Sequence, residues 1–510
     1  MTNVEKNARI VKNTAFLYLR MILMMLVSLY TSRIILQSLG VEDFGIYNVV
    51  AGIVVLFSFV SNAMALASQR FLSFSIGKNI EKEINRIFCM SLTTHIIIII
   101  FVIIIAETIG LFILYKMNFP NDRVTAIGWV YQIAIVTCCI NIVRVPYNAL
   151  IIAYEQMSFY AWISIIEAVL KLVIVFFLTS LNSDKLISYS FLLLFVTFLV
   201  DIFYFLYCKK QFSVSKYHFI WDRKLLTEFA NFSGWSLAGS LASVGVHQGL
   251  NMIINIFFGV TVNAAVGISN QVMGVVSQFL SNFQTAFNPQ LVKSYAKGDT
   301  DYFINLIFKS SKISFFLMLI IALPILVNCH FFLDVWLDTV PEYATSFSQL
   351  MIIFLLVESI SGPLWMAVQA TGKIKGYQLM ISILLIINIP ISLFFLYKGF
   401  SPTCVFVVRV ILNFVALLAR ILYLGYLINF QIKKFLYKVM LPILEVGLLS
   451  IIIPLILYIN LDINWKNVFL ISFVCVAYSL VLIYFIGLNA QEKNMITHYI
   501  NKYKKNVDQI

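Results

Sequence analysis

The sequence predicts an all-α polytopic membrane protein with about fourteen transmembrane helices. Of its 510 residues, 61% are hydrophobic and 12% are charged, and its mean hydropathy is +0.93. A chain of this composition has too little polar surface for a water-soluble globule. Apolar segments long enough to cross a bilayer, about 20 residues each, recur throughout the chain. No hydrophilic interval between them is long enough for a soluble domain.

The first six predicted spans belong to an N-terminal part, residues 1–207, at about 13–39, 44–68, 88–115, 124–150, 158–181 and 186–207. The first apolar run contains Arg20 and Arg33, which makes it too long and too charged for the core of a signal peptide, so we expect it to be a retained helix. In the fourth span, Pro146 is expected to kink the helix or end it.

Residues 208–231 form the longest inner connection, and they mix basic with aromatic side chains. We expect this linker to lie on anionic lipid. A C-terminal part, residues 232–430, follows with spans at about 232–258, 262–290, 303–329, 343–370, 377–397 and 402–428. Residues 431–510 add two spans, at about 438–459 and 467–488, and a short basic tail.

Two stretches of the chain, residues 33–53 and 252–272, are similar to each other. A shift of 219 residues aligns Gly40 with Gly259 and Val41 with Val260. Each copy ends one apolar segment and begins another through a short connection that contains glycine. A true repeat predicts two halves that enter the membrane in the same direction, related by a two-fold axis along the membrane normal. Chance similarity is the alternative.

The net charge of +13 is typical of nucleic-acid-binding proteins, but its distribution indicates membrane topology instead. Twenty-five lysines and arginines fall in the N-terminus and alternate connections, against five in the other connections. This bias predicts that both termini are cytoplasmic. The seven cysteines are scattered, and their spacing predicts neither a metal site nor a disulfide framework.

Three predicted spans carry polar side chains at helical spacing along one face. They are Ser236, Ser240, Ser243, His247 and Asn251 in span seven; Asn270, Gly274, Ser277, Ser281, Thr285 and Asn288, widened by Gln271, Gln278 and Asn282, in span eight; and Ser58, Asn62, Ala65 and Gln69 in span two. Small and hydroxylated residues in such stripes often only let helices pack closely. The amides and the histidine favour a hydrated cavity.

Six basic residues lie inside predicted spans: Arg20, Arg33, Arg144, Lys171, Arg409 and Arg420. Each would cost about 2.5 to 3.5 kcal/mol at a lipid-facing bilayer centre, so we expect them to face protein, water or an anionic ligand. Lys171 can pair with Glu167 four residues earlier, and Arg33, Arg144 and Arg420 can snorkel from the span ends. Arg20 has no acid nearby in the sequence.

Glu358 is the embedded acid closest to the middle of a span, and it precedes the helix-disturbing Pro363. A carboxyl group there can carry a coupling ion, a proton or sodium. A structural hydrogen bond to backbone freed by the proline is the alternative.

Four segments resemble bacterial polysaccharide flippases of the Wzx type. They are SLGVEDFGIYNVVAGI at 38–53, SQRFLSFSIGK at 68–78, RVPYNALIIAYE at 144–155 and NPQLVKSYAKGD at 288–299. Such flippases belong to the MOP exporter superfamily, with the MATE drug exporters and the lipid II flippases. The resemblance implies two six-helix lobes around a central cleft, plus two C-terminal helices, with the cleft lined largely by spans one, two, seven and eight.

The resemblance also implies transport of an undecaprenyl-pyrophosphate-linked oligosaccharide, for O-antigen or capsule, from the inner to the outer leaflet of the bacterial cytoplasmic membrane. We expect a monomer that needs no cofactor, contacts membrane lipids and works beside polysaccharide polymerase machinery. Guanidinium groups suit pyrophosphate, and the resemblance makes Arg20 and Arg70 the candidates for binding it, with amides of spans seven and eight facing sugar hydroxyls. Together with the polar stripes and embedded charges, this gives the candidate cavity residues Arg20, Arg70, His247, Asn251, Asn270, Gln271, Arg409 and Arg420.

Two other functions compete with this one. A MATE-like small-molecule antiporter shares the superfamily, although span one has no acidic residue and the interior is cationic for a pump of cationic drugs. A membrane polymerase, ligase or glycosyltransferase that handles the same lipid carrier could use Glu42 or Asp43 as its catalytic acid. Every predicted outer connection is short, whereas such enzymes usually carry a large outer loop.

Overall fold

The computed structural model describes residues 13–494 except 25–26, 28–30, 32–33, 36–37, 40–42, 44–45, 48–49, 51–57, 117–119, 180–182, 338–339, 429 and 491. Every regular element in these residues is a helix. The chain divides into two compact units. Unit 1 contains residues 1–240, 285–302 and 369–378, and unit 2 contains residues 241–284, 303–368 and 379–510.

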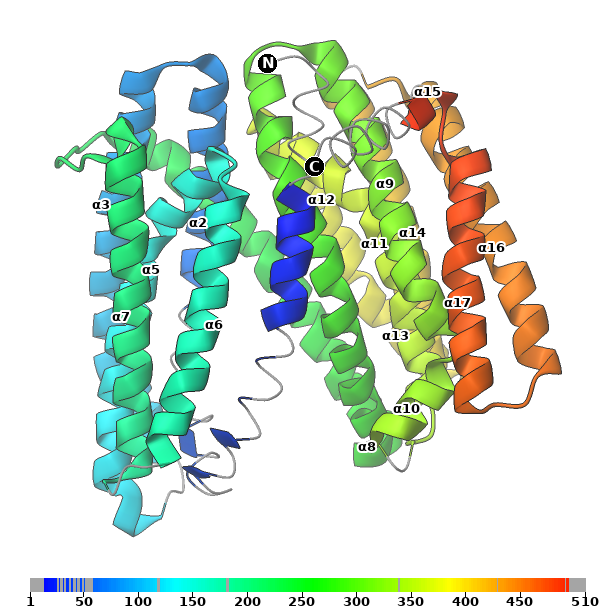
Figure 1. Cartoon of the computed structure of the whole chain (residues 1–510), viewed down its shortest axis with the longest axis horizontal. Helices are drawn as coiled ribbons and strands as arrows, with labels where there is room; N and C mark the ends of the chain where they lie inside the picture. Colours follow the sequence, from blue (N-terminus) through cyan, green and yellow to red (C-terminus); the bar gives the residue numbers. More distant parts are fainter. Residues whose placement is uncertain are drawn as a thin grey trace, which may run out of the picture. The chain divides into compact units, whose positions relative to one another are not determined.

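Five long helices form most of unit 1: α2 (Ser58–Lys78), α3 (Glu81–Ile105), α5 (Val124–Ala153), α6 (Met157–Thr179) and α7 (Lys185–Gln211). Helix α5 packs against the other four, as Figure 1 shows for α5 beside α7. Short elements connect them: η1 (Ala106–Gly110), α4 (Leu111–Lys116), η2 (Asn121–Arg123) and η3 (Ser213–Ser215). Helix α5 does not end at Pro146 but continues to Ala153.

Helix α8 (Arg223–Ala296) is two helices joined at Gly259. Gly259 has φ 77° and ψ −171°, a backbone conformation that is essentially restricted to glycine. The sequence predicted a glycine-containing connection between two spans at this residue, and the structure confirms it. Its partner in the proposed repeat, Gly40, lies outside the described residues.

Unit 2 contains the middle of α8 and nearly all of the later helices: α9 (Thr300–Val327), α10 (Cys329–Leu337), α11 (Ala344–Thr371), α12 (Lys375–Ile386), α13 (Asn388–Tyr397), α14 (Thr403–Ile428), α15 (Ile432–Phe435), η4 (Leu436–Met440), α16 (Leu441–Asn460), α17 (Trp465–Leu482) and η5 (Ile483–Gly487). Its main core lies between both parts of α8 and the helices α10, α11, α13 and α14, around the fully buried Phe347 and Met351. Helix α11 passes through Pro363 without ending.

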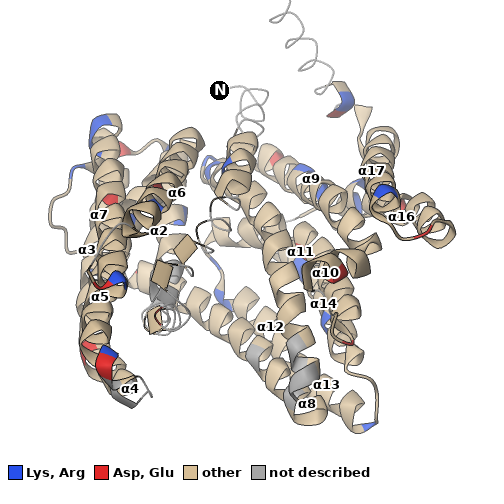
Figure 2. Ribbon diagram, turned by 60° about the horizontal axis from the view of Figure 1, so that its bottom comes forward, with Lys and Arg blue, Asp and Glu red and all other residues tan. Residues whose placement is uncertain are grey.

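Eleven helices in the described residues are long and apolar enough to cross a membrane. They coincide with eleven of the predicted spans. The other three, at 13–39, 44–68 and 262–290, either include residues outside the described part or carry the polar stripe of span eight, so the total of fourteen stays a prediction. Figure 2 shows long uncharged stretches along the helices, with charged residues gathered near many of the helix ends.

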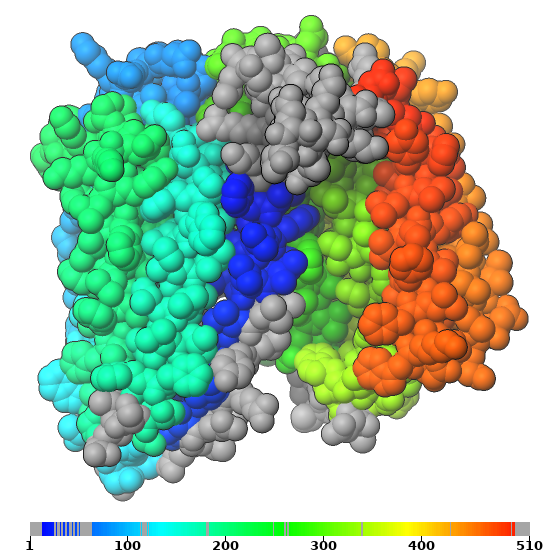
Figure 3. Space-filling model, viewed as in Figure 1, coloured from blue at the N-terminus to red at the C-terminus, as the bar shows by residue number. Residues whose placement is uncertain are grey.

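The helices also carry exposed apolar faces of the kind that contact lipid. Helices α16 and α17 pack side by side, and their outward residues form the orange to red surface in Figure 3. Large apolar side chains exposed on this pair include Leu448, Ile456, Phe469 and Phe473. An all-helical membrane protein, as predicted, is therefore confirmed.

Candidate functional site

An enclosed cavity of about 10 Å³ lies inside unit 2. Its lining is His247, Leu250, Asn251, Ile254, Val266, Asn270, Val405, Phe406 and Arg409. These residues come from α8 on both sides of Gly259 and from α14. The turn at Gly259 lets the polar stripes of the two α8 segments line one space. Four predicted site residues therefore come together here: His247, Asn251, Asn270 and Arg409.

Arg409 is the charged group of this cavity. Its Nη1 lies 3.3 Å from Nδ1 of His247, and its guanidinium lies 4.7 Å from the centre of the Phe354 ring. Within the described residues, no carboxylate lies within 4.0 Å of the Arg409 guanidinium, although the Glu358 carboxylate attracts it over a longer distance. The predicted site residue Gln271 is exposed and does not line the cavity.

Arg420 lies eleven residues after Arg409 on α14 and has a different environment. Its Nη1 donates to Oε2 of Glu358 at 3.2 Å, and its side chain is 9% exposed. Glu358 therefore has a charged partner on another helix, an interaction that the sequence did not predict. Asn413, on the same side of α14, donates to the carbonyl of Phe354 at 3.1 Å. A coupling role for Glu358 stays a prediction.

In unit 1, embedded charges form a second network. Lys171 donates to Glu167 at 2.6 Å, as the four-residue spacing predicted. Arg144 lies 3.5 Å from Glu167 and 3.3 Å from Asp201, so it pairs with two acids within unit 1. Arg20 lies over the Tyr160 ring at 4.5 Å, and its buried Nε has no hydrogen-bond partner in the described residues. Arg33 lies outside the described residues.

Arg70 binds the end of helix α11. Its Nε donates to the carbonyl of Gln369 at 2.7 Å and its Nη2 to that of Ala370 at 3.3 Å. Carbonyls at a helix C-terminus lack intrahelical donors, so the guanidinium caps them. Burial lowers the pKa of Arg70 to about 10, which leaves it charged at neutral pH. A contact with pyrophosphate, as predicted, would have to compete with this capping.

Two of the segments that carry the family resemblance meet inside unit 1. Glu155, at the end of the segment 144–155, accepts a hydrogen bond of 2.6 Å from Gln290 of the segment 288–299. Glu155 also forms an ion pair with Lys293 of the same segment. Gly77, in a third segment, lies so close that a Cβ would come within 2.9 Å of the Lys293 backbone. Sequence reasoning did not place these residues together, although their occurrence in the quoted segments was a signal.

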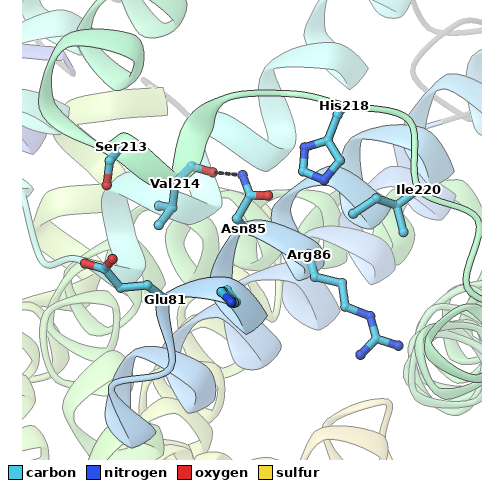
Figure 4. A pocket seen from close by; sticks show the side chains of 8 residues that line it. Glu81, Asn85, Arg86, Ser213, Val214, His218 and Ile220 are labelled. Carbon is cyan, nitrogen blue, oxygen red and sulfur yellow. Dashed lines mark hydrogen bonds between the residues drawn. The ribbon is translucent and has the colours of Figure 1, made fainter.

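The predicted connection 208–231 is shorter in the structure, because α7 continues to Gln211 and α8 begins at Arg223. A second, open cavity of about 600 Å³ lies where this connection packs on the start of α3. Figure 4 shows Asn85 of α3 pointing at the carbonyl of Val214, a hydrogen bond of 2.8 Å. Arg86 pairs with Asp222. The connection is therefore anchored on α3, while Phe219 is 70% exposed. Contact of this connection with anionic lipid stays a prediction.

The candidate catalytic acid Asp43 takes part in a network of ion pairs. It is buried, and its carboxylate accepts two hydrogen bonds from Arg123, with Nε to Oδ1 at 2.9 Å. Arg123 also donates to Asp184 at 2.6 Å. The three residues link segments that are far apart in the sequence. Glu42 lies outside the described residues.

Comparisons with known proteins identify the architecture. Residues 240–394 match the MatE family model. A crystal structure of MATE in complex with MaD3S is 16% identical, covers 85% of this chain and 99% of its own, and has a TM-score of 0.72. The chain has the MATE fold. A multidrug resistance MATE family transporter of the MOP superfamily, in an outward-facing conformation, is 14% identical, covers 85% and 99%, and also has a TM-score of 0.72.

A third MATE-fold structure, from Pyrococcus furiosus, is described as a MOP superfamily transporter whose reversed binding-pocket polarity suggests a different function. It is 15% identical, covers 83% of this chain and 96% of its own, and has a TM-score of 0.66. No curated protein matches the sequence. The fold implied by the resemblance is confirmed as the MATE fold. The place of this chain among MOP exporters and its Wzx-type specificity stay predictions.

Proposed function

We propose that this chain is a MATE-fold membrane transporter that exports an anionic substrate by alternating access. The pairing of the embedded acids with arginines supports an anionic substrate. Glu167 and Asp201 face Arg144, and Glu358 faces Arg420. With these acids paired, the hydrogen-bonding neighbour of Arg409 is His247, and Glu358 attracts Arg409 only over a longer distance.

A cationic substrate fits this arrangement poorly. Binding of a cation inside a membrane protein is favoured by an acid without a cationic partner, and a guanidinium nearby opposes the binding by repulsion in a medium of low dielectric constant. An anion reverses both arguments, because it adds a charge-assisted hydrogen bond and reduces the cost of burying the arginine.

Among anionic substrates, export of a small amphiphilic molecule is our first candidate. The MatE match over residues 240–394 and the MATE fold over most of the chain support a MATE-like exporter. The second candidate is flipping of undecaprenyl-pyrophosphate-linked oligosaccharide. Its support is the resemblance of the four quoted segments to Wzx-type flippases, together with Arg20, whose buried Nε has no hydrogen-bond partner in the described residues.

The substrate class can be tested with the full-length protein in proteoliposomes. Matched anionic and cationic fluorescent amphiphiles are loaded, and their protein-dependent movement is compared. We expect movement of anionic probes, reduced by Arg409→Gln and unaffected by the loop control Lys398→Gln. Movement of cationic probes alone would overturn the proposal.

A cellular assay separates the two candidates. Lipid-linked glycan is measured in each leaflet of cells with and without this chain. Accumulation on the cytoplasmic side only when the chain is missing, reproduced by Arg20→Ala, would establish the flippase. Normal glycan distribution together with lost efflux of small anions would establish the exporter.

A further inference from the structure

The open cavity at the start of α3 has two walls. One is the first turns of α3, with Lys82, Asn85 and Arg86, and the other is the connection between α7 and α8, with His218 (Figure 4). Asn85 donates to two carbonyls of the connection, at 2.8 and 2.9 Å, which holds the walls together. The cavity of about 600 Å³ is within the range of small-molecule sites, about 300 to 1,000 Å³. The fold therefore keeps a preformed space here that the proposed transport function does not use.

The charge around this cavity is positive on balance. Arg86 is exposed and pairs through Nη2 with Asp222, whose carboxylate also accepts hydrogen bonds from the backbone at the start of α8. Residues 81–86 and 212–224 together hold five cations and three acids: Lys82, Arg86, Lys216, Arg223 and Lys224 against Glu81, Glu83 and Asp222. An anionic group that enters the cavity is therefore attracted, although Glu81 in the lining opposes it.

Aromatic side chains place the cavity near the membrane surface. Tyr217, Phe219 and Trp221 are exposed and alternate along the connection. Tyrosine and tryptophan rings are typical of the boundary between lipid head groups and hydrocarbon. Helix α3 becomes uncharged beside the cavity, because no Lys, Arg, Asp or Glu follows Arg86 within it. These features put the cavity where lipid head groups lie.

The exposed apolar face of α3 continues from the two cations of the cavity. Eighteen residues make five turns of 3.6 residues, so Lys82 lies on the same face as Ile100. Arg86 lies on the same face as Ile104 for the same reason, and Ile97, Ile100 and Ile104 are all exposed. From Arg86 to Ile97 the helix rises about 16 Å, half of a hydrocarbon core of about 30 Å. A lipid of one leaflet can therefore lay its acyl chains on this face with its head group at Lys82 and Arg86.

We propose that the cavity between α3 and the connection from α7 to α8 binds the head group of one anionic phospholipid, whose acyl chains cover the exposed face of α3. The phosphate accepts charge-assisted hydrogen bonds from Lys82 and Arg86. The ligand is a lipid rather than a soluble phosphate, because the apolar face continues from these cations. Phosphatidylcholine is disfavoured, because its quaternary ammonium group is repelled by the same cations. This lipid site does not depend on which substrate the chain transports.

Native mass spectrometry of the full-length protein tests this lipid site. The protein is held in micelles with equal amounts of phosphatidylglycerol and phosphatidylcholine that carry the same acyl chains, and the lipid-bound species are counted. We expect one phosphatidylglycerol molecule to be retained at least about fivefold more strongly than phosphatidylcholine. Equal retention of the two lipids would overturn the proposal.

A soluble competitor distinguishes a lipid from a free anion. Glycerol phosphate has the head group of phosphatidylglycerol without its acyl chains. Added at a concentration equal to that of the lipid, it should leave the retained lipid in place, because it gains nothing from the apolar face of α3. Displacement of the lipid would indicate a site for soluble anions and would overturn the proposal.

Substitutions of opposite sign assign the bound lipid to the cavity. Lys82→Gln should weaken phosphatidylglycerol binding about fivefold, since it removes one basic side chain beside the head group. Glu81→Gln should strengthen that binding, because it removes the acid that opposes the phosphate. Both side chains are exposed, so the thermal midpoint without added lipid should stay unchanged. Weaker binding in Glu81→Gln would contradict the charge argument.

The matched control is Lys297→Gln, which removes the same charge from an exposed position of unit 1 outside the cavity lining. It should change phosphatidylglycerol binding by less than about twofold, because screening weakens the attraction between distant exposed charges. A loss in Lys297→Gln as large as that in Lys82→Gln would mean that the lipid responds to overall charge. That result would refute the site, as would unchanged binding in the double variant Lys82→Gln with Arg86→Gln.

Discussion

Removal of either partner from the ion pair between Glu155 and Lys293 should strongly destabilise the protein. The Glu155 carboxylate has no exposed surface, and the Lys293 side chain is 13% exposed. Gln290 donates a further hydrogen bond of 2.6 Å to the same carboxylate. We expect Glu155→Gln to destabilise the protein, because it leaves the Lys293 ammonium buried without this carboxylate.

The expected loss in the free energy of unfolding follows from the burial of this ion pair. Removal of one partner from a buried pair costs about 3 to 5 kcal/mol, against less than about 1 kcal/mol for an exposed pair. Lys293→Met should cost a similar amount, since it removes this cation from the buried carboxylate. The double variant Glu155→Gln with Lys293→Met removes both charges, so its loss should be well below the sum of the two single losses.

Equilibrium unfolding in mixed micelles, followed by intrinsic fluorescence, gives the free energies for this double-mutant cycle. The exposed pair partner Arg86, 55% exposed, provides a control: Arg86→Gln should change the free energy of unfolding by less than about 1 kcal/mol. Additive losses from Glu155→Gln and Lys293→Met would refute the reasoning, because they would mean that the two charges do not interact energetically.

Three further substitutions test local features. Gly259→Ala should cost about 1 to 3 kcal/mol of stability in the same unfolding assay, because of its φ of 77°, whereas Gly267→Ala, with open space for a Cβ, should be neutral or stabilising. Gly77→Ala should cost about 1 to 3 kcal/mol, since its Cβ would lie 2.8 Å from that of Ala296; a loss no larger than that of Gly267→Ala would contradict this. Asp43→Asn should lower the thermal midpoint and leave transport by the surviving protein intact, as expected of a structural acid; complete loss of function in stable protein would indicate a chemical role.

Features that depend on neighbouring residues were predictable from the sequence. A transmembrane span needs only a local apolar run, and eleven predicted spans coincide with helices of the required length and composition. Gly259 was identifiable because a short glycine connection interrupts the apolar pattern. His247 and Asn251 lie on one face because the helical period places them there, and the turn at Gly259 brings Asn270 to the same cavity.

Features that depend on the choice of a distant partner were not predictable. The sequence allowed Arg420 either to snorkel or to pair with an acid. In the structure its partner is Glu358, which lies 62 residues away in the sequence. Glu155 and Lys293 are separated by 138 residues. Several acids and bases in this chain are equally eligible by type, and only the packing of the helices determines which of them lie within 4 Å of one another.

The partner assignments also show how several embedded charges are compensated, while a substrate contact by Arg420 stays a prediction. A membrane protein must compensate each buried charge, and Arg144, Lys171 and Arg420 are compensated by acids of their own unit. Of these pairs, those of Arg144 and Arg420 join two helices within one unit. Arg409 differs because its neighbours are a histidine, an aromatic ring and a cavity. Under the proposed function, Arg409 is therefore the embedded cation that an anionic substrate would contact, whereas the total of embedded cations carries no such information.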